Sequence, residues 1–261
     1  MRIKVLVAVV LVALVTAAVI VKWKWFPSAK EADFAMGMRS LQQASAGLVV
    51  LRPTHYPRSH FHGVIATVVP VAGKPVERFL GRNVSFKELI TTAYGQNAGR
   101  VTLPWDAPKT NFDFLVTVSE RQQERLQEAI RKQFGFVARQ ESRETEVLAV
   151  RVANAQLPGL SISGADTKES VEFKEERLWF RHVRVSALNS GLEGALGQPV
   201  VDKTGLTNVY DFSLAWDPQV RDELQNGATA RAAADKLLNG FGLALTPDRA
   251  TLDVLVVKRG E

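Results

Sequence analysis

The sequence predicts an α+β fold made of two tandem β-α-β-α-β-β modules, and three observations lead to this prediction. The composition, with 46% hydrophobic and 23% charged residues, is that of a globular protein that buries a core. The length of 261 residues accommodates two small domains beside a short additional segment. Short apolar runs bounded by turn residues alternate with amphipathic segments, and part of this pattern occurs twice.

The N-terminal apolar run predicts a membrane anchor or signal sequence in residues 1–27. Residues 5–21 contain no charge, and as a helix rising about 1.5 Å per residue they span roughly 26 Å, close to a bilayer core of about 30 Å. Lysines and tryptophans at positions 22–25 suit the headgroup interface. We therefore expect a single-pass inner-membrane protein, held by residues 5–21, with its body in the periplasm. The alternative is a signal peptide cleaved near residues 16–18, which leaves a secreted or periplasmic protein.

A helical stalk is expected to follow, over residues 28–47. Ser28 and Glu31 have the spacing of a capping box, so a helix is predicted for residues 29–46, ending near Gly47. Beyond this helix the chain becomes rich in β-branched residues and turn signals. Strands are predicted at residues 48–51, 64–71 and 76–80.

Three sequence matches occur in the same order in two parts of the chain. The matched segments are 84–85 with 185–186, 112–114 with 210–212, and 134–152 with 241–259. Their preserved order indicates an internal duplication. We therefore predict a first α+β module at residues 48–155, a connector at 156–180 and a second module at 181–261.

Each module is predicted to hold its helices on one face of a small mixed sheet. In the first module Ser85 opens a capping box with the glutamate three residues on, and Ser119 with Gln122 is expected to cap the second helix. Gly135 and Gly242 stand where a left-handed residue ends a helix. The segment after each of these glycines is predicted to fold as a closing hairpin.

The residue inventory excludes several classes of function. The chain has no cysteine, which excludes disulfide scaffolds, thiolate metal sites and cysteine nucleophiles. Its net charge of +6 is spread without a basic run, so no nucleic-acid partner is predicted. His55, His60 and His62 are interpreted as part of a solvated loop, with a weak zinc or copper site as the alternative. His182 is interpreted as a structural or surface residue.

Two motifs near residue 200 resemble catalytic signatures without matching them. Residues 197–204 come within one residue of a phosphate-binding loop, but Asp202 stands in the place of a glycine, where a carboxylate repels phosphate. Lys203, Thr204 and Gly205 resemble an element of penicillin-recognising enzymes, but the Ser-x-x-Lys and Ser-Asp-Asn elements are absent. A polar turn between two strands is the favoured interpretation.

Asp113 and Asp211 recur at matched places, each between two aromatic residues. One carboxylate in each module does not make the acid and base pair that acts on a single substrate. We interpret both as outward-facing strand residues, with the flanking aromatics in the core. No catalytic residue, cofactor or metal is therefore predicted.

A family resemblance covers nearly all of the body. The Asp-Lys-Thr-Gly-Leu stretch within residues 200–207 and the Tyr-Asp-Phe at 210–212 resemble an uncharacterised family abundant in soil bacteria, a domain of unknown function. Residues 89–94, 112–114 and 133–148 fit the same family. Asn208 departs from it, since a glycine is expected there. The resemblance extends over about residues 48–259 and implies export and a two-repeat architecture. The repeats are similar to the short N-terminal (STN-like) modules of secretins and TonB-type outer-membrane proteins, which bind proteins.

These observations predict a non-catalytic, membrane-anchored envelope protein that acts as a protein-binding or assembly module, with another envelope protein as its partner. The candidate partner surface is expected in a cleft between the modules. It comprises Asp202, Lys203, Thr204, Gly205, Tyr210 and Asp211. The alternative is a sensory ectodomain that binds a small envelope ligand in an apolar pocket between the modules.

Overall fold

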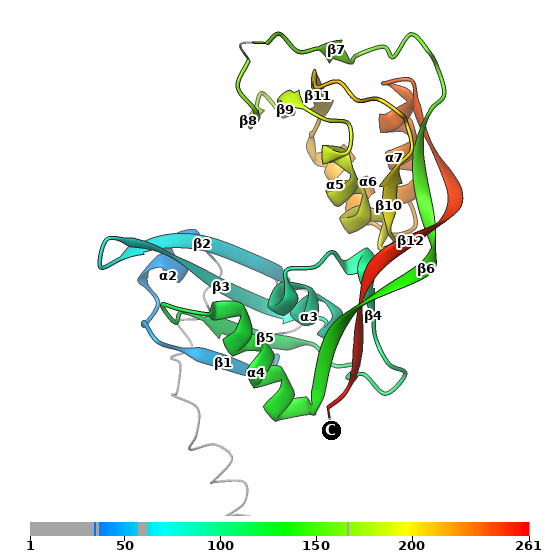
Figure 1. The fold of residues 1–261 in the computed structure, drawn as a ribbon. Coiled ribbons are helices and arrows are strands. Elements are labelled where there is room, and N and C mark those ends of the chain that lie inside the picture. Colours follow the sequence, from blue (N-terminus) through cyan, green and yellow to red (C-terminus); the bar gives the residue numbers. More distant parts are fainter. Residues whose placement is uncertain (1–33, 35–36, 57–61, 166, 261) are drawn as a thin grey trace, which may run out of the picture. The chain divides into compact units, whose positions relative to one another are not determined.

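The structure, a computed structural model, describes residues 34, 37–56, 62–165 and 167–260 (Figure 1). These residues form a mixed α+β protein, as the sequence predicts, and they divide into two compact units. The first unit holds the described residues up to 95 together with 104–137 and 258–260; the second holds 96–103 and 138–257. The predicted membrane segment lies outside the described ranges, and within those ranges no helix is both long and apolar enough to cross a bilayer.

The first unit is built on sheet A, a four-stranded antiparallel sheet. Its strands, in spatial order, are β1 (Val49–Pro53), β5 (Phe112–Val116), β3 (Lys74–Val84) and β2 (Gly63–Val71). Its helices are α2 (Met38–Gln43), α3 (Phe86–Tyr94) and α4 (Gln122–Phe134). The three strands predicted before residue 81 are confirmed as β1, β2 and β3.

Strands β2 and β3 form a hairpin closed by a two-residue turn. Ala72 and Gly73 both have positive φ, 50° and 79°, as a type I′ turn requires. The pairing then runs without a shift from the turn to Gly63 opposite Arg82. This register makes β2 an uninterrupted edge strand of sheet A.

The starts of α3 and α4 differ in how well the sequence predicts them. At α3 the predicted capping box is confirmed, because the Ser85 hydroxyl accepts from the N–H of Glu88 and the Glu88 carboxylate accepts from the N–H of Ser85. At α4 the predicted Ser119–Gln122 cap is wrong. Arg121, with a φ of 54°, precedes the helix, and no side chain caps it. Gly135 ends α4 in the left-handed conformation, as predicted.

The described part of the predicted stalk is short and packs on sheet A. Gly37 before α2 is extended, with a φ of 170°, so the predicted continuous helix is wrong at this point. The guanidinium of the buried Arg78 in β3 donates to three carbonyl groups at the end of α2, where helix carbonyls lack partners. These carbonyls belong to Leu41, Gln42 and Ala44, at 2.9–3.2 Å. An apolar cluster joins this segment to the sheet and comprises Phe34, Leu41, Leu48, Val50, Leu80 and Leu115.

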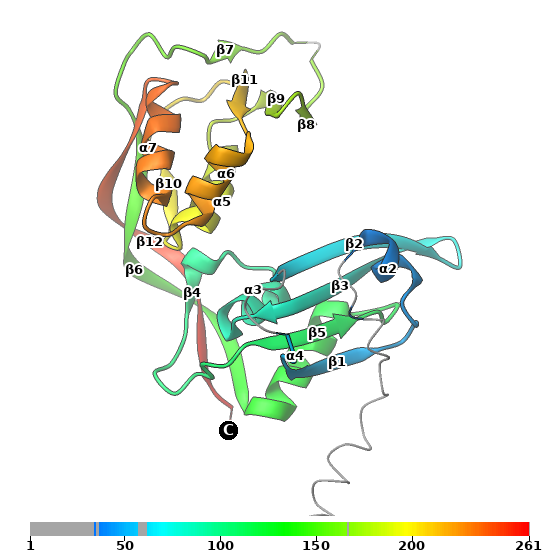
Figure 2. The same ribbon diagram turned by 180° about the vertical axis from the view of Figure 1, so that it is seen from behind.

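The other face of sheet A carries an aromatic core beneath α3 and α4. This core consists of four phenylalanine rings whose contacting pairs have centroids 5.0–6.2 Å apart: Phe86, Phe112, Phe134 and Phe136. Within this core Gly81 of β3 adjoins Phe114 of β5, and a Cβ on Gly81 would lie 2.0 Å from the Phe114 ring. The two views of the ribbon show α2 and α4 on opposite faces of sheet A (Figures 1 and 2).

The second unit contains two four-stranded sheets and three α-helices within its described residues. Sheet C has the order β7 (Ser161–Ile162), β11 (Tyr210–Ala215), β9 (Arg177–Val183) and β8 (Ser170–Lys174). Sheet B has the order β10 (Val200–Asp202), β6 (Phe136–Val152), β12 (Leu243–Arg259) and β4 (Val101–Thr102). The helices are α5 (Ala187–Leu196), α6 (Pro218–Gln225) and α7 (Ala230–Asn239), with the short 3-10 helix η2 (Ala98–Arg100).

Two long strands take the place of the predicted closing hairpins. β6 and β12 each run for 17 residues. Gly260 donates its N–H to the carbonyl of Gly135 at 2.7 Å, and Ala153 donates to Gly242 at 2.8 Å, so the two strands are antiparallel. The hairpin prediction is wrong because no residue inside either strand has the positive φ of a tight turn. Polar residues in the middle of each strand lie at exposed positions instead.

Pro247 lies inside β12, where a residue without an N–H usually interrupts a ladder. It is tolerated because β4 pairs only with Leu255 and Val256. The edge of β12 facing β4 is therefore unpaired at Pro247.

Residues of sheets B and C and of α5, α6 and α7 form one apolar core of the second unit. The ribbon shows these helices beside both sheets (Figure 1). The second module was predicted to hold two helices, whereas the described residues of its range contain three, α5, α6 and α7. The predicted connector, residues 156–180, contributes β7 and β8 to sheet C. The predicted module ranges also differ from the two units, because β6 carries residues 138–152 into the second unit.

Candidate functional site

The Asp-Lys-Thr-Gly segment forms a turn stabilised by its own side chains. The Asp202 carboxylate accepts from the backbone N–H of Thr204 at 2.9 Å and from its hydroxyl at 2.6 Å. The Thr204 hydroxyl oxygen in turn accepts from the N–H of Leu206, and Gly205 has a φ of 71°. These are the bonds with which Asp and Thr stabilise turns. The predicted polar turn between β10 and β11 is therefore confirmed, and no helix follows it as a phosphate-binding loop requires.

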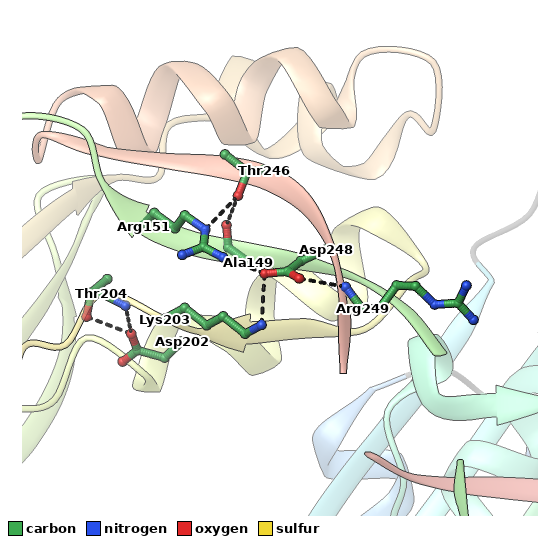
Figure 3. Close-up of polar contacts among 8 residues, drawn as sticks. All are labelled: Ala149, Arg151, Asp202, Lys203, Thr204, Thr246, Asp248 and Arg249. Carbon is green, nitrogen blue, oxygen red and sulfur yellow. Dashed lines mark hydrogen bonds and ion pairs between the residues drawn. The ribbon is translucent and has the colours of Figure 1, made fainter. Parts of the chain in front are cut away.

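A charged network adjoins this turn on sheet B (Figure 3). Lys203 Nζ lies 2.8 Å from an Asp248 carboxylate oxygen, and the Arg151 guanidinium bonds the same oxygen. The Lys203 ammonium, the N–H of Arg249 and the Arg151 guanidinium lower the pKa of Asp248 from 3.8 to about 2. Asp248 is therefore ionised at neutral pH and is poorly suited to act as a general acid.

Tyr210 and Asp211 of the predicted surface have different environments in β11. The Tyr210 side chain is buried in the core of the second unit, so it is not part of an exposed surface. Asp211 accepts from the N–H of His182 at 2.8 Å, and this bond is the main cause of its lowered pKa. His182 has a φ of 53°, so the Asp211 carboxylate supports a backbone conformation that non-glycine residues rarely adopt.

Asp113 occupies the corresponding place in sheet A and is fully buried, at 0% exposed. Its carboxylate accepts from the N–H of Asn83, whose φ is 53°, at 3.0 Å. It also accepts from Arg52 at 3.3 Å and from the N–H of His55 at 3.4 Å. The interpretation of Asp113 as an outward-facing residue is therefore wrong. The carboxylate points into the protein because it satisfies buried donors beside a shift of register between β3 and β5.

A buried ionic group that the sequence did not reveal lies in the second unit. Glu193 of α5 is 1% exposed, and Arg100 binds one of its oxygens through Nε and Nη2 at 2.8 and 2.7 Å. The N–H of Val200 donates to the same oxygen as Arg100 at 3.0 Å, and Asn97 donates to the other oxygen at 2.6 Å. The carboxylate therefore joins α5 to both η2 and β10. No local sequence pattern marks this group, because Arg100 and Asn97 lie 93 and 96 positions from Glu193.

The backbone near this group is tightly packed. Gly99 of η2 lies against Gln198, and a Cβ added to Gly99 would lie 2.6 Å from a Gln198 backbone atom. Residues 96–103 are thus held in the second unit by hydrogen bonds, by close packing and by the pairing of β4 with β12.

The predicted histidine cluster lies partly outside the described residues, at His60. Of the others, His55 donates its N–H to Asp113, and His62 lies just before β2. Among the described residues, no three His, Cys, Asp or Glu side chains are grouped so that they could hold a metal ion. His182 is structural, as predicted, because its backbone binds Asp211.

Sheet C has an apolar strip that continues beyond the helices covering it. Phe212 and Leu214 of β11 are buried, and their partners on β9, Phe180 and Leu178, are partly buried. Those partners pair in turn with two residues of β8. These are Val171 and Phe173, which are 55% and 63% exposed. Directly paired residues lie on the same face of a sheet, so the apolar strip reaches the open edge at β8.

Comparison with known proteins identifies a family match. A family model described as a protein of unknown function (DUF3738) matches residues 87–259, about two thirds of the chain. No curated protein and no solved structure is detectably similar to the chain.

Proposed function

Because the chain belongs to the DUF3738 family of proteins of unknown function, we propose a function from its geometry: a non-catalytic protein-binding module of the cell envelope. The observation that carries the proposal is the apolar strip at the edge of sheet C. Val171 and Phe173 leave more than half of their surface exposed, and grouped exposed apolar residues mark interaction sites.

The backbone of β8 is open at the same two residues. The β8–β9 hairpin closes on Lys174 opposite Arg177 through a turn at Glu175 and Glu176, both with a φ of 55°. In such a hairpin the pair that closes the turn is hydrogen-bonded, and along the strands hydrogen-bonded pairs alternate with pairs that are not bonded. Lys174 is therefore bonded to β9, whereas Phe173 and Val171 belong to the pairs that are not. The N–H and C=O groups of Val171 and Phe173 therefore point away from β9. An extended segment of a partner protein can add to this edge and place its apolar side chains on the strip.

A crosslinking pull-down from native membranes tests this proposal. With Phe173→Asp in the full-length chain we expect loss of the envelope partner, because a charge replaces the apolar contact. Ile162→Asp is the matched control, since Ile162 is 69% exposed on β7, at the opposite edge of sheet C. A partner captured equally by both variants would contradict binding at β8. Capture of no protein by the unmodified chain would equally contradict the proposal.

We also propose that residues 5–21 anchor the chain in the inner membrane with its body in the periplasm. The uncharged apolar run and the Lys and Trp residues after it support this location. Since the chain lacks cysteine, Trp105→Cys supplies one exposed thiol. A membrane-impermeant maleimide should label it in cells with a permeable outer membrane. Labelling only after the inner membrane is disrupted would place the body in the cytoplasm instead.

The two units further support a duplicated module as the origin of this architecture. Sheets A and C have the same strand order. When the four strands of each sheet are numbered in chain order, β1-β5-β3-β2 and β7-β11-β9-β8 both read first, fourth, third, second. Asp113 and Asp211 each accept from a residue with a φ of 53° in the neighbouring strand. An experimental structure with a different strand order in either sheet would refute this origin.

A further inference from the structure

The outer edge of sheet A is long and carries no charged side chain. β2 runs for nine residues, Gly63–Val71, and stands last in the strand order of the sheet (Figures 1 and 2). Val64 and Val68 are 38% and 57% exposed, and Ala66 between them is exposed. Proteins usually protect an open edge with charges, bulges or a short strand. Over the described residues β2 has only Pro70 as such a device.

The turn fixes which backbone groups of β2 are open. Val71 opposite Lys74 closes the two-residue turn, so this pair is hydrogen-bonded and bonded pairs alternate from it. The opposed Pro70 and Pro75 then fall on an unbonded pair, as residues without an N–H must. The outward N–H and C=O groups are those of Val64, Ala66 and Val68, the residues whose side chains are exposed.

We propose that two copies of this chain associate by antiparallel pairing of their β2 strands, with Ala66 opposite Ala66 of the second copy. In this register Val64 of each copy lies opposite Val68 of the other. Each of the three resulting pairs can exchange two N–H···O bonds, and Pro70 lies beyond them. A register shifted by two residues toward the turn places Pro70 of one copy opposite Val64 of the other. That pair loses one N–H···O bond, because Pro70 has no N–H. The edge is therefore self-complementary, as a two-fold interface requires.

Side-chain charges do not oppose pairing of β2 with a second copy. Glu77 of β3 lies opposite Val68, and in the proposed dimer it is separated from the other Glu77 by both β2 strands. By contrast, the register of β8 that pairs both of its open residues with a second copy brings like charges together. The register that pairs Val171 with Phe173 of a second copy places Glu172 opposite Glu172, and like charges directly opposite each other are destabilising. A second copy thus suits β2, and a different protein suits β8.

Site-directed crosslinking tests the β2 dimer directly, and it uses no other partner. Ala66→Cys in the full-length chain places two thiols across the two-fold axis, on residues with Cα atoms about 5.5 Å apart in a hydrogen-bonded pair. Val64→Cys is the matched control on the same strand and face. Its two thiols would be offset by four residues, roughly 14 Å at about 3.4 Å per residue. We expect a short bifunctional maleimide in native membranes to give a covalent dimer with Ala66→Cys and little with Val64→Cys.

A second variant separates specific pairing from random collision. Val68→Pro removes an outward N–H that no strand of sheet A uses, so in the Ala66→Cys chain it should abolish the covalent dimer while the fold is kept. Equal crosslinking at positions 64 and 66, no crosslinking at 66, or a dimer unaffected by Val68→Pro would overturn the inference. The purified chain without other proteins gives the same readout, so this result is independent of partner capture at β8.

Discussion

Replacing Arg100 with alanine should destabilise the second unit by about 3–5 kcal/mol, the cost of leaving a buried charge without its ionic partner. The Glu193 carboxylate is 1% exposed, and Arg100 makes two of its hydrogen bonds, at 2.8 and 2.7 Å. Without the guanidinium the carboxylate remains buried, with Asn97 and the N–H of Val200 as its remaining neighbours. Urea denaturation of the variant and the unmodified chain measures the difference.

Arg249→Ala is the matched control for Arg100→Ala. Arg249 forms an ion pair with Glu144 at 3.5 Å in which both side chains are largely exposed. Such a pair contributes less than about 1 kcal/mol. Hydrogen exchange should also increase in residues 96–103 of the Arg100 variant, because η2 loses the two bonds from Arg100 to α5 and keeps only the one from Asn97. If both alanine variants cost the same, Glu193 and Arg100 do not hold this segment in place.

Replacing Gly81 with alanine should destabilise the first unit by about 1–3 kcal/mol through overpacking. The added Cβ would lie 2.0 Å from the Phe114 ring, closer than any real contact. Phe114 is fully buried, so the ring can move only by displacing its neighbours in the aromatic core. The thermal midpoint and the free energy of unfolding in urea both measure this effect.

Gly194→Ala is the control of opposite sign. Gly194 lies within α5, and a Cβ there would meet nothing within 4 Å. Alanine in a helix is more stable than glycine by roughly 0.5–1 kcal/mol, so this variant should be slightly more stable than the unmodified chain. If Gly81→Ala leaves the free energy of unfolding unchanged while Gly194→Ala raises it, Phe114 does not fill the space at Gly81.

Local chemistry made part of the fold predictable. The capping box of Ser85 and Glu88 depends on residues three apart, and both of its bonds form. The turn from Asp202 to Gly205 likewise depends on side chains that bond within two residues. Features of this kind are encoded within one short segment, so a sequence pattern is enough to find them.

Non-local contacts account for most of what the sequence did not reveal. Glu193 and Arg100 are 93 residues apart, and Arg78 reaches α2 across more than 30 positions. No local sequence pattern predicts either contact. The burial of Asp113 was missed for a related reason, because its donors come from β3 and from the segment after β1.

The candidate binding strip was missed because its strand lies in a segment interpreted as a connector. Val171 and Phe173 alternate with Ser170, Glu172 and Lys174, which is the period-two pattern of a strand with one apolar face. The pattern is only five residues long, and β9 supplies the partner that makes it a strand. The predicted surface, in contrast, consists mainly of a self-contained turn and a buried tyrosine.

Residue-resolved photo-crosslinking from β8 tests most directly the claim that this protein binds a partner through sheet C. A photoreactive phenylalanine analogue at position 173 points to the apolar face, and the same analogue at position 172 points to the opposite face one residue away. Binding at the strip predicts a discrete crosslinked envelope protein from position 173 and little from position 172. Equal adducts from both positions, or none from either, would contradict the account.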